Sequence, residues 1–213
     1  MKRIVITGGT GGLGSAIAVK FRETGWDVIS LGSKDLDLTD ADAVKAFFTK
    51  ARCDLLVCAA GIIRDQPLAK MTETEWDEVF GVNFSAARRC AQAALPEMEK
   101  RGIGHVIFIS SYAALHPAVG QAAYGAAKAT LLGLTKEFAE EYGGSGVRVN
   151  AVLPGFLETP MTLAVSKERK ESIRNLHFLK RFNTVEMAAE FIWFLEEKMA
   201  AASGQAFPLD SRP

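Results

Sequence analysis

The sequence has few cysteines, no excess of charge of either sign and no long apolar run, and each shortage excludes a class of protein. Only three of the 213 residues are cysteine. The spacing of Cys53, Cys58 and Cys90 indicates reduced thiols packed in a core, not disulfides or a metal site. Basic and acidic residues number 25 each, whereas nucleic-acid-binding domains typically carry a basic excess. No apolar stretch approaches the roughly 18 residues of a membrane span. We therefore expect a cytoplasmic protein with no nucleic-acid, membrane or metal partner.

Short β-branched runs alternate along the chain with segments of helical periodicity. Strands are expected at residues 3–7, 26–31, 54–59, 105–110, 147–153 and 205–209. Helices are expected at residues 15–24, 40–51, 72–101, 124–142 and 186–198, with Thr39 as the N-cap of the second. This alternation predicts an α/β fold, a doubly wound parallel sheet with helices on both faces, formed by a single domain over residues 1–213.

A glycine-rich turn, Thr7-Gly8-Gly9-Thr10-Gly11-Gly12-Leu13-Gly14, joins the first expected strand to the first expected helix. Glycine at such a turn allows a tight bend, close approach of a pyrophosphate and close packing of the helix on the strand. A phosphate there lies at a helix N-terminus, where free N–H groups and the helix dipole favour an anion. A loop that merely needs positive φ angles has the same composition, but the position between strand and helix favours a dinucleotide-binding loop.

Tyr124 and Lys128 are four residues apart, so on a helix they share one face. A nearby ammonium group favours the phenolate form of tyrosine. We therefore expect Lys128 to lower the pKa of Tyr124 and make it a usable acid or base near neutral pH. A tyrosine and a lysine on the protein surface, with no catalytic role, could have the same spacing. A catalytic role is favoured by Ser111, at the carboxyl end of an expected strand where ligands bind in open α/β sheets, and by Asn83, in the middle of an expected helix.

Together these motifs resemble the short-chain dehydrogenase/reductase family, in its compact single-domain branch. The matching residues, in family order, are Thr7, Gly8, Gly12, Gly14, Asp37, Leu38, Cys58, Ala59, Ala60, Gly61, Asn83, Ser111, Tyr124, Lys128, Pro154, Gly155 and Thr159. The resemblance covers nearly the whole chain and is closest in general pattern to 3-oxoacyl-acyl-carrier-protein reductases. It implies a Rossmann-type three-layer α/β/α fold and an NAD(P)-dependent oxidoreductase, which reduces a carbonyl or oxidises a secondary alcohol by hydride transfer.

The resemblance implies a role for each catalytic residue. Tyr124 would protonate the carbonyl oxygen during reduction, or act as the base in the reverse direction. Lys128 would bind the nicotinamide ribose hydroxyls, Ser111 would hydrogen-bond the substrate oxygen, and the backbone carbonyl of Asn83 would hold a water that relays protons to Lys128. Substrate contacts are expected from Ser111, His116, Tyr124 and Phe156. For His116 the alternative is a loop residue that packs beside Pro117.

The resemblance also implies the cofactor contacts. These are Thr7, Gly8, Thr10, Gly12, Leu13, Gly14, Ser33, Lys34, Asp37, Leu38, Ala59, Ala60, Gly61, Tyr124, Lys128, Pro154, Gly155 and Thr159. Gly61 would keep the cofactor channel open, and the segment from Pro154 to Thr159 would fix the carboxamide. After the second strand, Ser33 and Lys34 suit a 2′-phosphate, whereas Asp35 suits a free 2′-hydroxyl. The balance favours NADP over NAD.

The chain departs from the family pattern in two places. The usual Asn-Asn-Ala-Gly motif is here Cys58-Ala59-Ala60-Gly61. Only residues 32–36 separate the second expected strand from Asp37, where the family has a helix and a third strand. Because this segment is too short for a crossover, we expect the helix to be absent and the third strand to be vestigial.

Residues 156–182 correspond to the substrate lid of the family. Between Met161 and Arg181 the lid carries six basic and two acidic residues. It could therefore meet an anionic substrate, such as a phosphopantetheine carrier or a coenzyme A ester. The alternative, which we favour, is a solvated amphipathic lid helix with Leu163, Ile173 and Leu176 facing inward.

Two other functions are compatible with the same skeleton. A catalytically silent dinucleotide-binding sensor or scaffold would keep the glycine-rich turn, but would not need the Asn, Ser, Tyr and Lys set. A sugar-nucleotide-modifying member would need an added C-terminal substrate domain, which the short stretch after Thr159 does not provide. The resemblance further implies a small-molecule carbonyl substrate and a homodimer or homotetramer, formed through the helices expected at residues 72–101 and 124–142.

Overall fold

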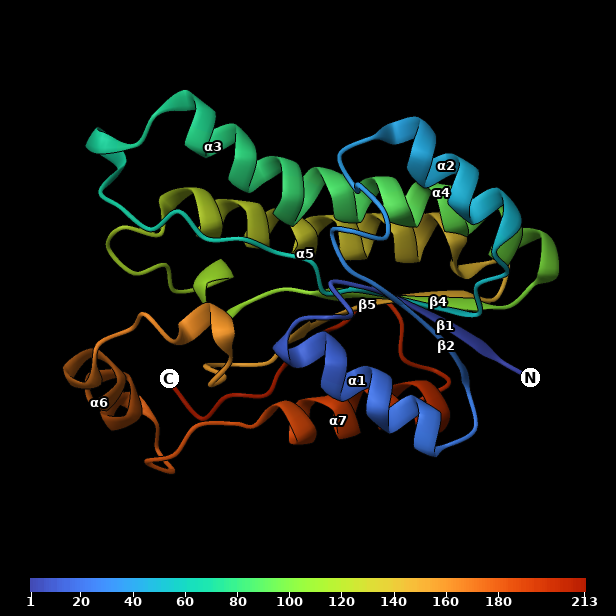
Figure 1. Cartoon of the computed structure of the whole chain (residues 1–213). Coiled ribbons are helices and arrows are strands. Elements are labelled where there is room, and N and C mark those ends of the chain that lie inside the picture. The colour runs from blue at the N-terminus through green and yellow to red at the C-terminus, as the bar shows by residue number, and fades with distance from the viewer.

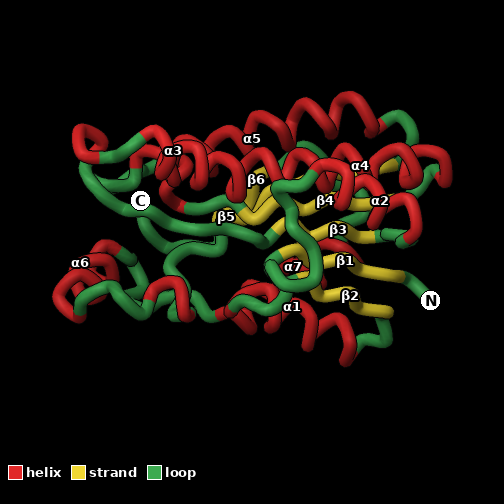
Figure 2. The backbone as a smooth tube through the Cα atoms, turned by 45° about the horizontal axis from the view of Figure 1, so that its top comes forward, coloured by secondary structure: helices red, strands yellow, loops and turns green.

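Six strands form one all-parallel sheet in the computed structural model, which describes all 213 residues. They are β1 Arg3–Thr7, β2 Asp27–Leu31, β3 Leu55–Cys58, β4 Gly104–Ile109, β5 Val147–Leu153 and β6 Ala206–Pro208. Their order across the sheet is β2-β1-β3-β4-β5-β6 (Figure 2). The predicted α/β class is confirmed, and each predicted strand agrees with these bounds to within one residue at either end.

Helices cover both faces of the sheet. They are α1 Gly12–Glu23, α2 Ala41–Lys50, α3 Glu73–Phe80, α4 Ala86–Arg101, α5 Ala122–Gly143, α6 Lys167–Leu176 and α7 Val185–Lys198. Figure 1 shows α2, α3, α4 and α5 on one face and α1 and α7 on the other, with α6 set apart at one end. The predicted three-layer arrangement is therefore confirmed. None of the helices combines the length and apolar character that crossing a bilayer requires.

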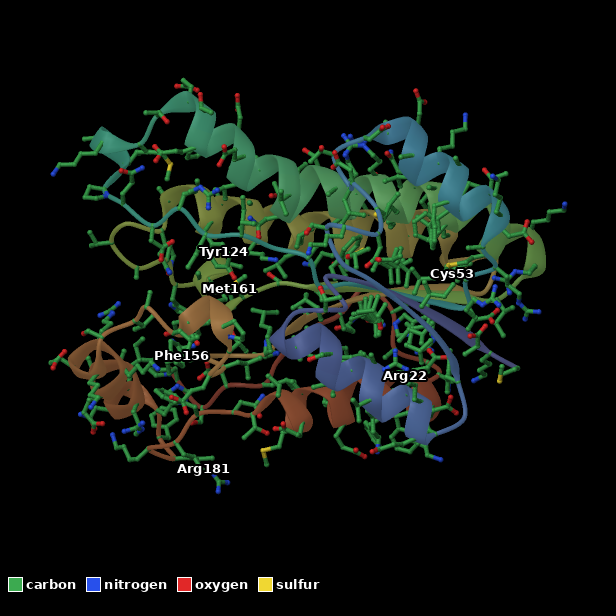
Figure 3. All side chains as sticks on the ribbon, viewed as in Figure 1. Arg22, Cys53, Tyr124, Phe156, Met161 and Arg181 are labelled. Carbon is green, nitrogen blue, oxygen red and sulfur yellow. The ribbon has the colours of Figure 1, made fainter.

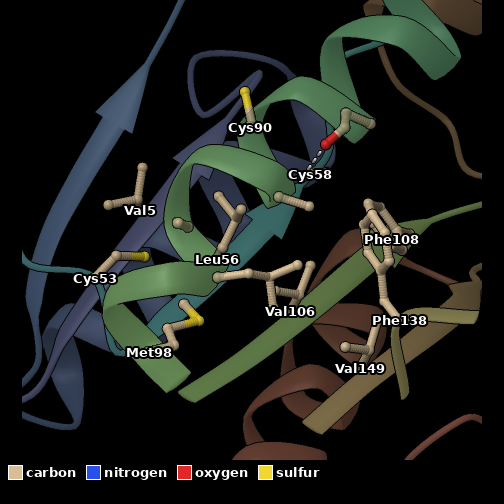
Figure 4. Packing of buried hydrophobic residues seen from close by; sticks show 14 of the residues in the cluster. Val5, Cys53, Leu56, Cys58, Cys90, Met98, Val106, Phe108, Phe138 and Val149 are labelled. Atoms are coloured by element: carbon tan, nitrogen blue, oxygen red, sulfur yellow. Dashed lines mark hydrogen bonds between the residues drawn. The ribbon is translucent and has the colours of Figure 1, made fainter. Parts of the chain in front are cut away.

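Alternate residues of each strand pack into two separate cores, one under each helical layer, because successive side chains of a strand point to opposite faces. In β1, Ile4 and Ile6 pack with α1 and α7, whereas Val5 packs with α2 and α4. The core that contains Val5 also holds the three cysteines, which are buried and free as predicted: Cys53, Cys58 and Cys90 (Figure 4). Burial raises the pKa of Cys53 and Cys90 to about 12, so these thiols are packing groups and not nucleophiles.

No helix or strand lies between Leu31, the last residue of β2, and Ala41, the first residue of α2. The shortened segment therefore lacks both the helix and the third strand, and β2 is an edge strand of the sheet. The connecting loop is tied to α4, where Arg89 donates a hydrogen bond to the carbonyl of Leu38 at 2.6 Å.

The N-cap of α2 is Asp40 and not Thr39. The Asp40 carboxylate accepts the backbone N–H groups of Asp42 and Ala43, at 2.9 and 3.0 Å. The prediction of Thr39 was wrong because the hydroxyl of Thr39 instead donates to the carboxylate of Asp37, at 2.7 Å.

The segment predicted to be the lid contains a short 3-10 turn, Pro160–Thr162, followed by α6. The prediction that Leu163 and Leu176 face inward was wrong, since their side chains are 75% and 56% exposed. The lid is instead anchored just after α6 by His177, which is buried and packs edge-on against Phe182 at 5.6 Å between ring centroids.

The switch point of the topology lies at the carboxyl ends of β1 and β3, the place where open α/β sheets form a ligand-binding crevice. The chain runs from β1 outward to β2 and then returns to β3 on the other side of β1. At such a switch point the loops after neighbouring strands diverge, and open α/β sheets bind their ligands there. Figure 3 shows Tyr124, Phe156 and Met161 toward the end of the molecule that carries the lid, and Cys53, which precedes β3, toward the opposite end.

Candidate active site

The glycine-rich turn after β1 forms a close-fitting cradle in the crevice. Gly8 has a φ of +68°, and a Cβ atom there would lie 2.7 Å from the backbone of Ala60 in the turn after β3. A Cβ atom on Gly14 would collide with the carbonyl oxygen of Gly8. Gly11 caps α1 without a side-chain hydrogen bond, so the first N–H groups of the helix are free for an anion. The cradle therefore fits the pyrophosphate of a dinucleotide.

Two further contacts extend the cradle to its ends. A Cβ atom on Gly12 would lie 2.7 Å from the side chain of Thr159, so the segment after β5 closes one side of the turn. At the other side, a Cβ atom on Gly32 would lie 2.7 Å from Oγ1 of Thr10. The structure thus brings together the turns that follow β1, β2, β3 and β5, which the sequence predicts to hold the cofactor.

The residues expected at the adenosine end lie on the loop after β2. Ser33 and Lys34 are exposed. The carboxylate of Asp35 accepts the backbone N–H of Gly32 at 2.8 Å, so it stabilises the turn. The carboxylate of Asp37 is likewise held within the loop, by the N–H and hydroxyl of the residue two positions on. Leu38 is half-buried against the core.

Tyr124 and Ser111 place two hydroxyl groups together at the carboxyl end of β4. Tyr124 lies in the first turn of α5, and the neighbouring Ser111 side chain acts to lower the pKa of its hydroxyl. The Ser111 oxygen also accepts the backbone N–H of Ala113 at 3.2 Å, within the 3-10 turn Tyr112–Ala114.

The pKa of Tyr124 is raised, whereas the sequence predicted that Lys128 would lower it. Burial is the largest cause because it disfavours the phenolate. The hydrogen bond from Ser111 opposes this effect, and the charge of Asp65 adds to it. The Lys128 ammonium lies 5.8 Å from the Tyr124 ring centroid, and burial lowers the pKa of Lys128 itself to about 8. In this state the phenol is protonated at neutral pH and can act as an acid.

Lys128, Asn83 and Gly61 converge beside Tyr124. Lys128 is buried and its ammonium donates to the carbonyl of Ile109 at 2.9 Å. The Asn83 amide nitrogen donates to the carbonyls of Ile62 and of a residue one turn earlier, both at 2.9 Å, and its Oδ1 is buried without a partner. A Cβ atom on Gly61 would lie 2.7 Å from Oδ1 of Asn83 and 3.6 Å from Nζ of Lys128. A side chain at position 61 would therefore collide with Asn83.

The two remaining residues expected at the substrate lie on the outer side of the site. His116 is exposed and stacks on Tyr112 at 4.7 Å between ring centroids. Phe156 is half-buried and packs against Phe182 of the lid at 4.6 Å. Pro154 is buried and its carbonyl accepts a hydrogen bond from Asn183 at 3.0 Å.

Two features of the site were not predicted. The buried hydroxyl of Ser110 donates to the carbonyl of Lys128 at 2.8 Å and so ties α5 to β4. The only indication of this role in the sequence was the position of Ser110 at the end of an apolar strand, next to Ser111. The predicted helix over residues 72–101 is divided by a π-helical turn, Gly81–Ser85, which contains Asn83. Such turns often occur at functional sites, and the position of Asn83 within the predicted helix was the only signal.

Replacing Gly14 by alanine is expected to weaken NADPH binding by about tenfold or more, because the added methyl group would displace the Gly8 turn. Calorimetric titration measures the Kd. Gly143→Ala is the matched control, since nothing lies within 4 Å of a Cβ atom there, and its Kd should equal that of the wild type. Unchanged affinity in Gly14→Ala would contradict the placement of the dinucleotide against this turn.

An open parallel α/β sheet with a glycine cradle at its switch point, beside a Tyr–Ser–Lys group whose lysine is buried, defines a dinucleotide-dependent oxidoreductase. Comparisons with known proteins agree. The family model described as Enoyl-(Acyl carrier protein) reductase matches residues 31–211. A 3-oxoacyl-[acyl-carrier-protein] reductase FabG of Thermotoga maritima is 34% identical over an alignment 236 positions long, gaps included, which covers 98% of this chain and 96% of that protein.

Solved structures give the same result. An oxidoreductase of the short chain dehydrogenase/reductase family from Burkholderia thailandensis is 30% identical, with a TM-score of 0.91 over 99% of this chain and 91% of that one. A structure described as ElxO with NADP bound is 26% identical, with a TM-score of 0.90 over 99% and 97% of the two chains. The chain belongs to the short-chain dehydrogenase/reductase family. It is an NAD(P)-dependent oxidoreductase that reduces a carbonyl group.

Proposed function

We propose that this chain reduces the keto group of a 3-oxoacyl thioester to a secondary alcohol, with NADPH as the reductant. The observation that carries the proposal is the pair of neighbouring hydroxyls of Tyr124 and Ser111, beside the buried ammonium of Lys128, which lies 5.8 Å from the Tyr124 ring centroid. This pair lies at the sheet edge that also carries the glycine cradle.

The proposed roles follow from these positions. The nicotinamide ring, when bound, supplies the hydride. Tyr124 donates a proton to the keto oxygen, and its raised pKa keeps that proton on the phenol until the oxygen becomes basic. Ser111 donates a hydrogen bond to the same oxygen and orients the carbonyl. Lys128 binds the ribose hydroxyls, and the backbone carbonyl of Asn83 holds a water that returns protons to Lys128.

The preference for NADP rests on the loop after β2. Ser33 and Lys34 are exposed there and can bind a 2′-phosphate. The carboxylate of Asp35, which would repel a phosphate, is held by the N–H of Gly32. The similar structure described as having NADP bound supports the same choice. The remaining contacts to the dinucleotide are those that the sequence predicts, at Thr7, Gly8, Thr10, Gly12, Leu13, Gly14, Asp37, Leu38, Ala59, Ala60, Gly61, Pro154, Gly155 and Thr159.

The thioester substrate is proposed from the lid, which we assign to residues 156–182 of a single domain. Apolar side chains on the lid are exposed and could meet an acyl chain: Met161, Leu163, Leu176, Phe178 and Leu179. The six basic residues between Met161 and Arg181 suit the phosphate of a pantetheine arm or an acidic carrier protein. The Thermotoga maritima relative is named as acting on such a carrier. His116 and Phe156 would line the approach.

We further propose a homodimer or homotetramer that pairs α4 and α5 across two-fold axes. Small exposed residues on α5, Ala126 and Gly133, permit close helix packing. A cytoplasmic location is supported by the three free, buried thiols, since reduced cysteines are typical of that compartment.

Initial rates of NADPH and NADH oxidation with a panel of carbonyl compounds test the proposed function. The panel comprises acetoacetyl thioesters of coenzyme A and of acyl carrier protein, a ketosteroid, a quinone, a keto sugar and a crotonyl thioester. We expect the acetoacetyl thioesters to give the highest kcat/KM, and NADPH to exceed NADH by about tenfold or more. Turnover of the crotonyl thioester alone would favour enoyl reduction. No turnover with NADPH still bound would favour a silent sensor.

A further inference from the structure

The last four residues, Asp210–Pro213, fold back onto three segments of the candidate active site. Asp210 and Arg212 form an ion pair whose side chains are only 4% and 8% exposed. Figure 1 places this end of the chain beside α6. A Cβ atom on Gly155, in the turn after β5, would lie 2.7 Å from the Asp210 carboxylate. The terminal segment is therefore packed against the site and does not trail into solvent.

Arg212 and Pro213 hold the residue next to Ser111. The Arg212 guanidinium carbon lies 3.6 Å from the centroid of the Tyr112 ring, a close cation–π contact. The Tyr112 hydroxyl donates to the carbonyl of Pro213 at 3.2 Å. Tyr112 begins the 3-10 turn in which the Ser111 oxygen accepts a backbone N–H. Fixing the Tyr112 ring thus fixes the turn that aims the Ser111 hydroxyl.

Asp210 and Ser211 hold the end of the lid. Asp210 lies 3.2 Å from Nδ1 of His177, and the hydroxyl of Ser211 is also 3.2 Å from that nitrogen. The backbone N–H of Phe178 donates to the carbonyl of Ser211 at 2.9 Å. His177 is buried, and its ring packs against Phe182, which in turn packs against Phe156.

The geometry points to the segment Asp210–Pro213 as a clamp that positions the Ser111 turn relative to the lid, with Arg212 as the positioning residue. Asp210 is the centre of the clamp because it accepts hydrogen bonds from Arg212 and contacts His177. Arg212, which is held by Asp210, in turn fixes the position of the Tyr112 ring. The catalytic role of this clamp depends on the carbonyl reduction proposed above.

Arg212→Ala is expected to lower kcat by about 10- to 100-fold, since small misplacements of a catalytic group have effects of this size. The Kd for NADPH should stay unchanged, because Arg212 does not contact the glycine cradle. Tyr112→Leu is the second variant, because it removes the ring and leaves the Asp210–Arg212 pair intact. Arg52→Ala is the matched control, since it removes an exposed guanidinium that pairs with Asp54 before β3.

A double-mutant cycle with Ser111→Ala separates positioning from general destabilisation. If Arg212 acts through Ser111, Arg212→Ala should change kcat by less than about twofold in the Ser111→Ala background. An equal loss in both backgrounds, or an unchanged kcat in both Arg212→Ala and Tyr112→Leu, would overturn the clamp. These rates are measured on whichever carbonyl substrate of the panel the wild type reduces fastest.

Amide hydrogen exchange gives a readout that does not need turnover. In Arg212→Ala and Tyr112→Leu, exchange should accelerate in peptides that cover residues 111–117 and 177–182, and not in the Arg52→Ala control. Unchanged exchange in both variants would overturn the clamp even if the wild type is active. Accelerated exchange in the two variants, combined with a wild type that reduces no carbonyl, would overturn the proposed function and the catalytic role of the clamp, while leaving its contacts intact.

Discussion

Replacing Tyr124 by phenylalanine is expected to lower kcat for carbonyl reduction by about 10²–10⁴-fold, the usual contribution of a positioned general acid. The substitution keeps the ring and removes only the hydroxyl, which neighbours Ser111. Because the glycine cradle is untouched, the Kd for NADPH should stay within about twofold of the wild type. Initial rates and calorimetric titration measure the two quantities.

Tyr142→Phe is the matched control for this experiment. Tyr142 lies at the other end of α5 and packs edge-on against Phe138 at 6.0 Å between ring centroids, away from the crevice. Its kcat should equal that of the wild type. If Tyr124→Phe kept more than about a tenth of the wild-type kcat, Tyr124 could not be the proton donor.

Replacing Lys128 by methionine is expected to abolish most activity and, at neutral pH, to stabilise the folded protein. The activity should fall by about 10²-fold or more, since the ribose hydroxyls lose their ammonium partner. The stability should rise because burial disfavours the charged ammonium, which lowers the pKa of Lys128 to about 8 from its usual 10.5. A difference of this size corresponds to about 3 kcal/mol. Losing the hydrogen bond to Ile109 offsets roughly 1 kcal/mol of it.

The sign of the pH dependence follows from the lowered pKa. Below pH 8 the ammonium is charged in both states, and the full penalty of burying it is present. Between pH 8 and 10.5 the unfolded chain holds the proton more tightly than the folded protein, so wild-type stability rises with pH. The Lys128→Met protein lacks this titrating ammonium. Its advantage in the free energy of unfolding should therefore shrink between pH 7 and pH 10.

Urea unfolding at the two pH values measures this difference. Ala129→Met is the matched control, because the same side chain is introduced one residue away on α5, where it replaces a half-buried alanine. A Lys128→Met protein less stable than the wild type at pH 7, or an advantage that does not shrink toward pH 10, would contradict the burial of a charged Lys128.

The order of strands and helices could be predicted because each strand is a compact β-branched run and the helices between them are amphipathic. Ile4, Val5 and Ile6 are all apolar, and such a run predicts a strand that is buried on both faces of the sheet. The shortened loop after β2 was equally predictable, since five residues cannot form a crossover. Helix ends were less predictable. Either Thr39 or Asp40 could cap α2, and the choice depends on the hydrogen bond that Asp37 makes.

The positions of the catalytic residues could be predicted, but their electrostatics could not. The spacing of Tyr124 and Lys128 places both on one helical face, yet it carries no information on how deeply that face is buried. Burial reverses the expected effect on the pKa of Tyr124 and lowers the pKa of Lys128. The π-helical turn at Asn83 is similarly a product of tertiary packing, since its side chain bonds to the loop carbonyl of Ile62.

The lid and the chain end were the least predictable parts. Helical periodicity suggested that Leu163 and Leu176 face inward, but the lid residue that anchors it is the buried His177, which contacts Asp210. Asp210 lies 33 residues further along the chain, and no local pattern links the two residues. The contact of Arg212 with Tyr112 spans a still greater distance in sequence. Such contacts are set by the whole fold.

The central claim is direct hydride transfer to a keto carbonyl held by Tyr124 and Ser111. It is tested most directly by mass spectrometry of the product formed from an acetoacetyl thioester and NADPH deuterated at both C4 positions. We expect a 3-hydroxybutyryl thioester that carries one deuterium at C3, formed by the wild type and nearly absent with Tyr124→Phe. A product without deuterium, or equal formation by both proteins, would contradict this claim.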